Sequence, residues 1–335
     1  MKNLLYIGNK LSKHGMTPTS IETLGPLLEQ EGFNVWYSSS KKNQVLRLVS
    51  MLYSVFRYKK ADAVLIDTYS TFNFWYAFAT SQLCRLLKLK YIPILHGGNL
   101  SSRLQKNPTI CKMIFKHSFQ NISPSLFLKE QFNVVGFGNI IYIPNAIELQ
   151  NYPFLERNKA TPKLLWVRSF ASIYNPLMAI EVFYNLRKKY PEATLCMVGP
   201  EKDGSLLKAK QKAKDLNVEV LFSGKLPKSD WIDLSKEFDF FINTTHFDNM
   251  PVSIVEAMAL GLAVVSTNVG GIPYLVENQK EGLLIPDNDV EKMVEAIEAL
   301  LEDPVLFCKL ASNSRHKAEQ FEWQSVKLEW VTILK

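Results

Sequence analysis

The stretch FDNMPVSIVEAMALGLAVVSTNVGG, residues Phe247–Gly271, contains the signals that decide the fold. Residues 251–260 follow a helical pattern that is apolar nearly all round, which is typical of a buried helix. Gly261 ends this helix, and the run LAVVST at 262–267 predicts a buried strand directly after it. A buried helix followed at once by a buried strand is typical of a parallel sheet that is covered on both faces.

The same alternation of apolar strands and amphipathic segments continues along the whole chain. The expected strands are, in order, LLYIG, FNVWY, AVLID, YIPIL, IIYIP, KLLWV, TLCMV, VEVLF, FDFFIN and LAVVST. A polar stretch without clear period at 148–162 separates two series of strands. The sequence therefore predicts an α/β protein with two doubly wound, Rossmann-like domains, at 1–150 and 160–318. Because ligands bind beyond the carboxyl ends of parallel strands, we expect the two sheets to face each other across a cleft.

The composition is that of a globular protein in a reducing compartment. The 335 residues are 47% hydrophobic and 21% charged, and a chain of this length forms about two domains. The four cysteines make no C-x-x-C pair, which argues against a disulfide framework or a zinc site. No apolar run reaches the ~18 residues of a transmembrane helix, and the first residues do not resemble a signal peptide. We therefore expect a cytoplasmic protein.

The positive charge is concentrated in the first half of the chain. The net charge is +7, and residues 1–150 hold 17 Lys and Arg against 7 Asp and Glu. This asymmetry predicts an anionic partner, either nucleic acid or an anionic membrane. No recognised nucleic-acid-binding motif accompanies the charge, so we expect no nucleic acid partner.

A basic amphipathic helix is expected at 43–57. Its polar stripe is formed by Asn43, Arg47, Ser50, Ser54 and Arg57. Its apolar face is formed by Val45, Leu48, Val49, Leu52 and Val55, and the flanking lysines are Lys41, Lys42, Lys59 and Lys60. Such a helix can lie on an anionic leaflet, although a helix that covers the sheet and exposes a basic edge explains the same pattern.

One carboxylate, Glu256, stands in the apolar helix, and no other charged side chain occurs between Asn249 and Val276. A buried carboxylate needs partners, and adjacent ribose hydroxyls offer two donors to its two oxygens. The free N–H groups at the start of the same helix form an anion site suited to a phosphate. Together they indicate a nucleotide site. A structural glutamate paired with a buried arginine or with backbone N–H groups is the alternative.

The run FDNMPVSIVEAMALGLAVVSTNVGGIPYLVE resembles the signature of the retaining glycosyltransferases of family 4, which have the two-domain GT-B fold. This resemblance covers the chain weakly at the amino end and strongly from 163 to 290. It implies that Glu256 accepts the ribose hydroxyls of a sugar nucleotide and that Asp248 contacts the donor sugar. It also implies that Val252 and Ser253 hold the diphosphate. As in similar folds, a last helix at about 320–335 is expected to pack back on the first domain.

Two departures from the family pattern concern the donor site. The first acidic residue is Asp248, where the family usually has glutamate. Arg168 in WVRSF matches the family arginine, but no lysine follows in ASIYNP. The positive charge opposite the diphosphate is therefore one short, unless Lys225 or a lysine of the first domain supplies it.

The resemblance also implies how the reaction proceeds. Arg168 and the helix start are expected to stabilise the leaving diphosphate, so we expect no metal and no other cofactor. The motif DND at 287–289 is interpreted as a helix cap. His96 is expected near the donor sugar or the reacting oxygen. Gly15 is expected to let the backbone approach the diphosphate, with Thr17 or Thr19 capping the following helix.

The sequence thus favours a retaining glycosyltransferase that moves a sugar from a nucleoside diphosphate sugar to a glycan or lipid-linked acceptor. Bacterial surface polysaccharide synthesis is the expected setting, with contact at the inner face of the plasma membrane. A GT-B nucleotide-sugar epimerase is the main alternative. A dehydrogenase should carry G-x-G-x-x-G, and an exported sugar-binding protein should carry a signal peptide.

Overall fold

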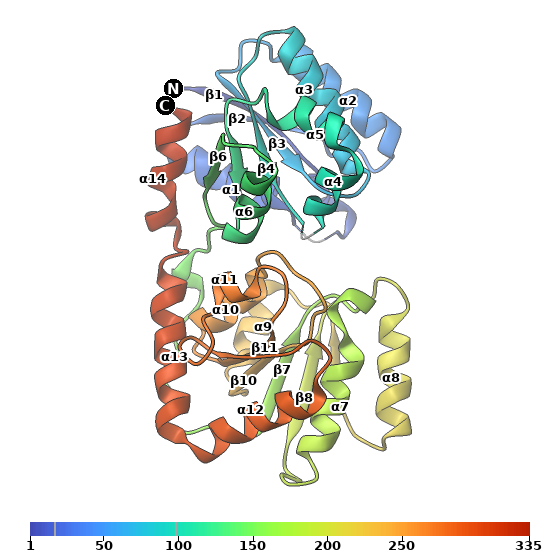
Figure 1. Cartoon of the computed structure of the whole chain (residues 1–335), viewed down its shortest axis with the longest axis vertical. Helices are drawn as coiled ribbons and strands as arrows, with labels where there is room; N and C mark the ends of the chain where they lie inside the picture. The colour runs from blue at the N-terminus through green and yellow to red at the C-terminus, as the bar shows by residue number, and fades with distance from the viewer. Residues whose placement is uncertain (17, 98) are drawn as a thin grey trace. The chain divides into compact units, whose positions relative to one another are not determined.

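A computed structural model describes residues 1–16, 18–97 and 99–335. The chain divides into two compact units (Figure 1). The N-terminal unit comprises Met1–Ala146 and Val326–Lys335, and the C-terminal unit comprises Ile147–Ser325. In the part of the chain that is described, no helix is long and apolar enough to cross a membrane.

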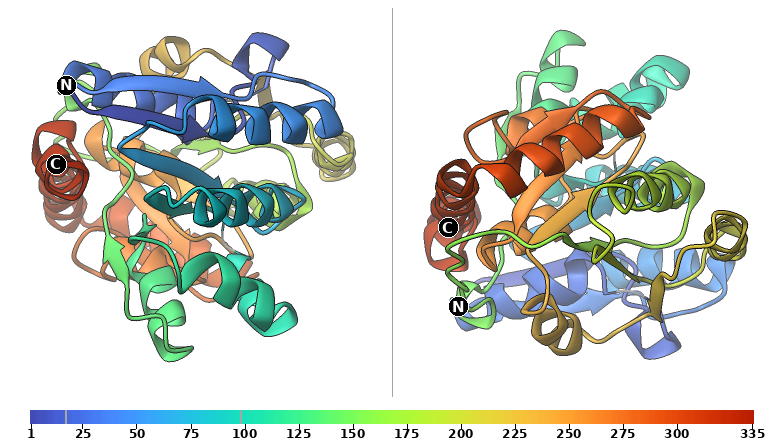
Figure 2. Two further views of the ribbon diagram at one scale, coloured as in Figure 1. Left: turned by 90° about the horizontal axis from the view of Figure 1, so that it is seen from above. Right: turned by 90° about the horizontal axis from the view of Figure 1, so that it is seen from below.

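The N-terminal unit contains one parallel sheet with the strand order β2-β1-β3-β4-β5-β6. Its strands are β1 (Asn3–Ile7), β2 (Asn34–Ser38), β3 (Ala63–Thr68), β4 (Tyr91–Leu95), β5 (Asn121–Ser123) and β6 (Ile140–Tyr142). Its helices are α1 (Ser20–Gln30), α2 (Gln44–Arg57), α3 (Asn73–Leu86), α4 (Leu100–Lys106), α5 (Pro108–Phe115) and α6 (Leu126–Val134). Most of the last helix, α14 (Trp323–Leu334), also belongs to this unit, where Lys327 forms an ion pair with Glu31 at 3.2 Å. The two chain ends lie close together there (Figure 2), and Lys2 donates a hydrogen bond to the Lys335 carbonyl.

The C-terminal unit contains a second parallel sheet with the order β12-β11-β10-β7-β8-β9. Its strands are β7 (Lys163–Val167), β8 (Thr194–Val198), β9 (Leu221–Gly224), β10 (Phe240–Asn243), β11 (Ala263–Thr267) and β12 (Leu283–Ile285). Its helices are α7 (Pro176–Leu186), α8 (Ser205–Asp215), α9 (Lys228–Ser235), α10 (Val252–Ala259), α11 (Ile272–Leu275), α12 (Val290–Glu302) and α13 (Pro304–Glu319). Leu164 and Trp166 pack into the core on one face of this sheet, and Leu165 packs into the core on the other. Both faces are therefore covered, as the continuously apolar strands predict.

These observations confirm the predicted fold class of two doubly wound α/β units. The order helix, glycine, strand in the opening stretch is also confirmed, since α10 is followed by Gly261 at a φ of 80° and then by β11. Two strands were not predicted, namely β5 and β12. Each has only three residues, which is too short for an apolar period to be recognised. The predicted strand VEVLF lies later than expected, because β9 begins at Leu221.

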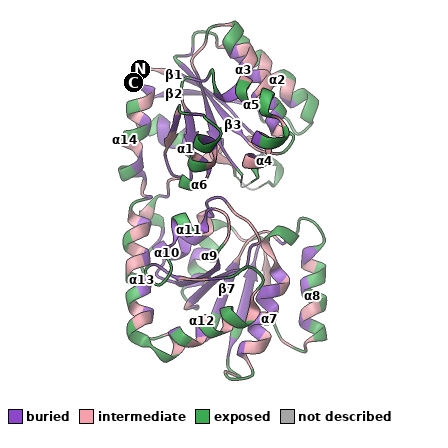
Figure 3. Cartoon of the chain, in the orientation of Figure 1, coloured by how far each residue is buried: buried purple, intermediate pink, exposed green. Residues whose placement is uncertain are grey.

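Of the two interpretations of α2, the helix that covers the sheet and exposes a basic edge is partly contradicted. Arg47 and Ser54 of the polar stripe are buried, whereas Val45 and Val49 of the apolar face are 68% and 57% exposed. Burial of Arg47 is tolerated because its guanidinium donates to the carbonyls of Lys41 at 2.7 Å and Lys42 at 2.8 Å. The exposed side of α2, which includes the green segments of this helix in Figure 3, therefore carries apolar residues such as Val45 and Val49.

Candidate active site

The carboxyl edge of the C-terminal sheet brings together Arg168 and Asp248. Arg168 follows β7, and Asp248 lies in the loop between β10 and α10. Because β7 and β10 are neighbouring parallel strands, their carboxyl ends lie side by side. Arg168 Nη2 lies 2.6 Å from Asp248 Oδ2, and both side chains are largely buried. The two predicted residues thus form one ion pair.

The Arg168 side chain is held by two further groups. Its Nε donates to Asn243 Oδ1 at 3.3 Å, and its guanidinium carbon lies 4.7 Å from the centroid of the Tyr174 ring. Burial raises the pKa of Tyr174, which keeps this ring neutral beneath the cation. Arg168 is therefore oriented before any ligand arrives.

A glycine turn fixes the loop that carries Asp248. The N–H group of Gly271 donates to the Asp248 carbonyl at 2.8 Å. A Cβ atom at Gly271 would lie only 1.8 Å from the carbonyl oxygen of Asn249, so the turn requires glycine. This close approach explains why GG follows the strand in the opening stretch.

Glu256 is buried in α10 and contacts a tyrosine and a lysine. Tyr152 Oη donates to Glu256 Oε1 at 2.8 Å, and Lys228 Nζ lies 2.5 Å from the same oxygen. The Glu256 side chain is 7% exposed and that of Lys228 is 57% exposed. Burial, followed by the charge of Glu256, raises the pKa of Tyr152, so this phenol remains a donor. Both contacts use Oε1, and neither partner is the arginine or backbone N–H of the alternative interpretation.

The start of α10 carries the buried hydroxyl of Ser253. Val252 and Ser253 are the first two residues of the helix, where backbone N–H groups have no acceptor within the helix. Ser253 Oγ is buried, and within residues 1–16, 18–97 and 99–335 it has no hydrogen-bond partner. Ser253 and Glu256 are three residues apart and therefore lie on the same side of α10. A polar ligand along this side would satisfy both.

Two lysines follow β9 at the same edge of the sheet. Lys225, the predicted substitute for the family lysine, is exposed. Lys228 begins α9 and forms the ion pair with Glu256. Sequence reasoning missed both Lys228 and Tyr152. The segment SGKLPKS after a strand was a signal for Lys228, but no local signal points to Tyr152.

The remaining predicted residues belong to the N-terminal unit. Gly15 ends the short 3₁₀ helix Ser12–His14 with a left-handed φ of 79°. Thr19 is the N-cap of α1, and its N–H donates to Glu22 Oε2 at 3.4 Å. Thr17, the other candidate cap, lies outside the described residues. His96 follows β4 and is buried, with Nε2 2.9 Å from Asp67 Oδ1.

The DND motif is confirmed as a helix cap. Asp289 is the N-cap of α12 and accepts a hydrogen bond from the Lys292 N–H at 2.9 Å. Asp287 lies 2.9 Å from His246 Nδ1. Among the residues that the structure describes, no group of three or more His, Cys, Asp or Glu side chains is arranged to hold a metal ion.

A doubly wound sheet with an arginine, a buried carboxylate and an open helix start at its carboxyl edge is typical of a nucleotide-binding unit. The model of the family Glycosyl transferases group 1 matches residues 150–321, which cover half of the chain. The chain belongs to this family.

Individual relatives are distant, and the first of them match only part of the chain. An uncharacterised glycosyltransferase of Haemophilus influenzae is 30% identical over 157 residues, which are 46% of this chain and 44% of that protein. The glycogen synthase of Mycobacterium tuberculosis is 26% identical over 57% of this chain and 47% of its own length. The chain thus spans less than half of these relatives. The UDP-Gal:alpha-D-GlcNAc-diphosphoundecaprenol alpha-1,3-galactosyltransferase of Escherichia coli is 24% identical over 89% of this chain and 74% of its own.

Solved structures match the fold over the whole chain. HepE from Anabaena, in complex with UDP and glucose, has a TM-score of 0.81 and 17% identity, covering 100% of this chain and 99% of that one. Sucrose-phosphate synthase from Thermosynechococcus elongatus has a TM-score of 0.80 and 14% identity, covering 99% and 98%. These similarities confirm the predicted GT-B fold class.

Proposed function

We propose that this protein is a retaining glycosyltransferase that moves a sugar from a nucleoside diphosphate sugar to a glycan or lipid-linked acceptor. The observation that carries the proposal is the arrangement on α10, where the buried hydroxyl of Ser253 precedes the buried carboxylate of Glu256 by one turn and has no hydrogen-bond partner among the described residues. A helix start suits a phosphate, and a carboxylate one turn further suits a ribose. Both groups belong to one helix of one unit.

The predicted residues of the C-terminal unit have the following roles in the proposed reaction. Glu256 accepts the ribose hydroxyls, and Asp248 accepts a hydroxyl of the donor sugar. Diphosphate binding is assigned to Arg168, Lys225, Val252 and Ser253 of the C-terminal unit. For His96, the proposed role is contact with the donor sugar or the reacting oxygen. Lys228 adds positive charge at the same edge and compensates for the lysine that is missing from ASIYNP.

In the transfer itself, the bond between the anomeric carbon and the phosphate oxygen breaks, and the acceptor oxygen bonds to that carbon. The acceptor proton passes to the leaving phosphate oxygen, so the protein needs to stabilise charge rather than supply a nucleophile. A guanidinium and helix N–H groups can provide this stabilisation, and we propose that the transfer requires no metal.

The proposed substrates follow from the same family relationship. The printed name of the Escherichia coli relative specifies a UDP-Gal donor and a diphosphoundecaprenol-linked acceptor. We propose the same chemical classes for this protein, with surface polysaccharide synthesis at the inner face of the plasma membrane as the setting. UDP-galactose and UDP-glucose are the first donors to test.

Release of nucleoside diphosphate from a panel of sugar nucleotides tests the function. We expect slow release without acceptor, faster release with a lipid-linked glycan, and equal rates with and without EDTA. An inverted sugar within an intact nucleotide would instead identify the epimerase, and the absence of sugar-nucleotide binding would contradict both. Loss of the rate in EDTA, with recovery on adding Mg²⁺, would contradict transfer without a metal.

The outer face of α2 is the proposed membrane contact. Its exposed apolar residues, named here the α2 apolar stripe, are Val45, Leu46, Val49, Tyr53 and Phe56. Lysines flank both ends of the helix, and residues 32–61 contain no acidic side chain. An apolar stripe between clusters of positive charge fits the interface of an anionic bilayer.

Replacing two residues of the α2 apolar stripe is expected to weaken this contact. The variant Leu46→Ser, Phe56→Ser should bind phosphatidylglycerol-containing vesicles at least about tenfold more weakly, because each buried apolar side chain contributes about 1.5–3 kcal/mol. Co-sedimentation measures the binding. The control is Leu207→Ser, since Leu207 is 74% exposed on α8 of the other unit. Equal binding of the variant and the control would contradict the proposal.

A further inference from the structure

Asp67, which sequence reasoning did not single out, lies beside His96 in the N-terminal unit. It is the penultimate residue of β3, and its side chain is 1% exposed. Oδ1 lies 2.9 Å from His96 Nε2 and accepts a hydrogen bond from Tyr6 Oη at 3.1 Å. Apart from the undescribed positions 17 and 98, nothing in the chain donates a hydrogen bond to Oδ2, which is also buried.

Such a carboxylate is costly to the folded state. A buried acceptor without a donor destabilises a protein by about 1–3 kcal/mol, and more when the group is charged. The neighbouring strand residues Ile66 and Thr68 are buried without this cost, so the sheet itself does not require an acid. A contribution to function is the simplest reason for keeping it.

We propose that Asp67 is a positioning residue that fixes the tautomer and the orientation of His96, an inference that rests on the proposed transferase function. An ionised carboxylate can only accept hydrogen bonds, so the His96 nitrogen that faces it, Nε2, carries the proton. In the neutral ring Nδ1 is then an acceptor. His96 therefore presents an acceptor to a hydroxyl of the sugar substrate.

Two further contacts restrict His96. The Tyr69 ring stacks on the His96 ring with centroids 4.9 Å apart and an interplanar angle of 27°. The backbone N–H of His96 donates to the Thr68 carbonyl at 2.8 Å, which connects the end of β4 to the end of β3. Burial, followed by the charge of Asp67, raises the pKa of both Tyr6 and Tyr69. Both phenols thus remain protonated beside the carboxylate.

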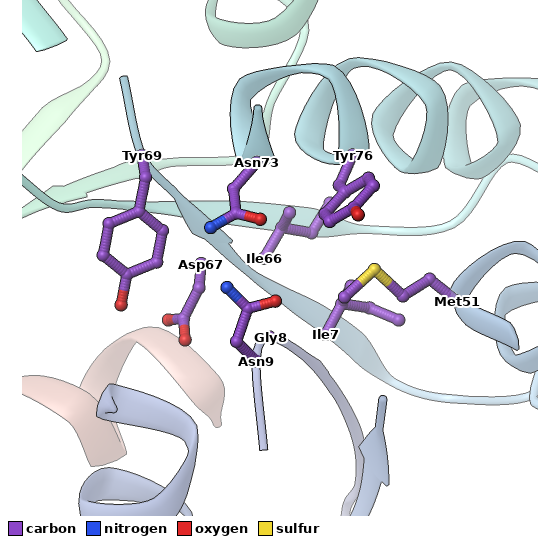
Figure 4. Close-up of a pocket in the computed structure, with 9 residues that line it drawn as sticks. All are labelled: Ile7, Gly8, Asn9, Met51, Ile66, Asp67, Tyr69, Asn73 and Tyr76. Atoms are coloured by element: carbon purple, nitrogen blue, oxygen red, sulfur yellow. The ribbon is translucent and has the colours of Figure 1, made fainter. Parts of the chain in front are cut away.

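The surroundings of Asp67 Oδ2 are polar. Asp67 borders a small cavity of about 10 Å³, with Asn9, Tyr69 and Asn73 as polar neighbours (Figure 4). This volume suits one water molecule, which could donate to Oδ2. Gly8 lies directly against Asp67 Oδ2. A Cβ atom at position 8 would lie only 2.5 Å from this oxygen.

The first test is a double-mutant cycle on sugar transfer. Asp67→Asn keeps the shape of the side chain and removes the acceptor-only character, so kcat should fall by about tenfold to a hundredfold with little change in donor KM. In the His96→Ala background, Asp67→Asn should have no further effect, because its action passes through His96. An equal fall in both backgrounds would show a purely structural role and overturn the proposal.

The second test does not depend on transfer activity. ¹⁵N-histidine labelling of the wild-type protein gives signals from five histidines, and His96→Ala identifies those of His96. We expect the Nε2–H tautomer in the wild type and its loss in Asp67→Asn. Tyr6→Phe, which removes the other contact of Oδ1, should retain the tautomer. An unchanged His96 spectrum in Asp67→Asn would overturn the positioning role. If the wild type transfers no sugar but shows the Nε2–H tautomer, the proposed transferase function is wrong. The inference that Asp67 orients His96 then still holds.

Discussion

Glu256→Gln should bind its sugar nucleotide about a hundredfold more weakly than the wild type. Glutamine has nearly the same shape but replaces one acceptor oxygen with an amide donor and removes the charge. Hydrogen bonds from the two ribose hydroxyls to a carboxylate contribute about 1.5–3 kcal/mol each. The substitution loses most of one hydrogen bond and weakens the other, which accounts for the expected loss of about a hundredfold in affinity. Isothermal titration calorimetry with the donor that supports turnover measures the change.

The matched control for this variant is Glu281→Gln. Glu281 is also buried in the C-terminal unit, and its Oε2 accepts a hydrogen bond from the Glu277 N–H at 2.8 Å. This substitution should leave donor affinity unchanged. A folded Glu256→Gln protein with wild-type affinity would contradict the assignment of Glu256 to the ribose, and its contacts with Tyr152 and Lys228 would then be its whole role.

Arg168→Ala should lower kcat by about two to three orders of magnitude, the usual effect of removing one charged group that stabilises a developing negative charge. The ion pair with Asp248 is lost at the same time, so Asp248 is left without its cation. The kcat of Arg168→Lys should lie between those of the wild type and Arg168→Ala. Lysine keeps the charge but lacks the planar donors that contact Asn243 and Asp248. Steady-state kinetics with varied donor concentration separate kcat from KM.

The control is Arg187→Ala, which removes an arginine that follows α7 in the same unit and lies over the Phe183 ring. It should leave kcat unchanged. If Arg168→Ala raised KM alone, Arg168 would bind donor and transition state equally, and the proposed role in stabilising the leaving diphosphate would be wrong.

Much of the fold could be predicted from the sequence because its signals are local. The buried helix around Glu256, the glycine that ends it and the strand that follows occupy neighbouring positions. The pairing of Arg168 with Asp248 also follows from a simple rule, because residues after adjacent parallel strands meet at one edge of the sheet. The short strands β5 and β12 escaped prediction because three residues carry no recognisable period.

The contacts of the candidate site depend on residues that are distant in the sequence. Tyr152 is separated from Glu256 by 104 positions and Lys228 by 28, so neither contact follows from a local pattern. The face of α2 shows the same limit. Arg47 turns inward because its guanidinium donates hydrogen bonds to carbonyls of the preceding loop, which a helical projection does not reveal.

The sequence by itself determined the α/β class, the two series of strands and the motif that leads to Arg168, Asp248 and Glu256, because periodicity and turn chemistry act between near neighbours. Only the tertiary structure decided which groups contact Glu256, which side of α2 is exposed and that Asp67 contacts His96. These contacts and exposures depend on how segments that are distant in the sequence pack together. Packing determines which polar groups are buried and which partners compensate their charges.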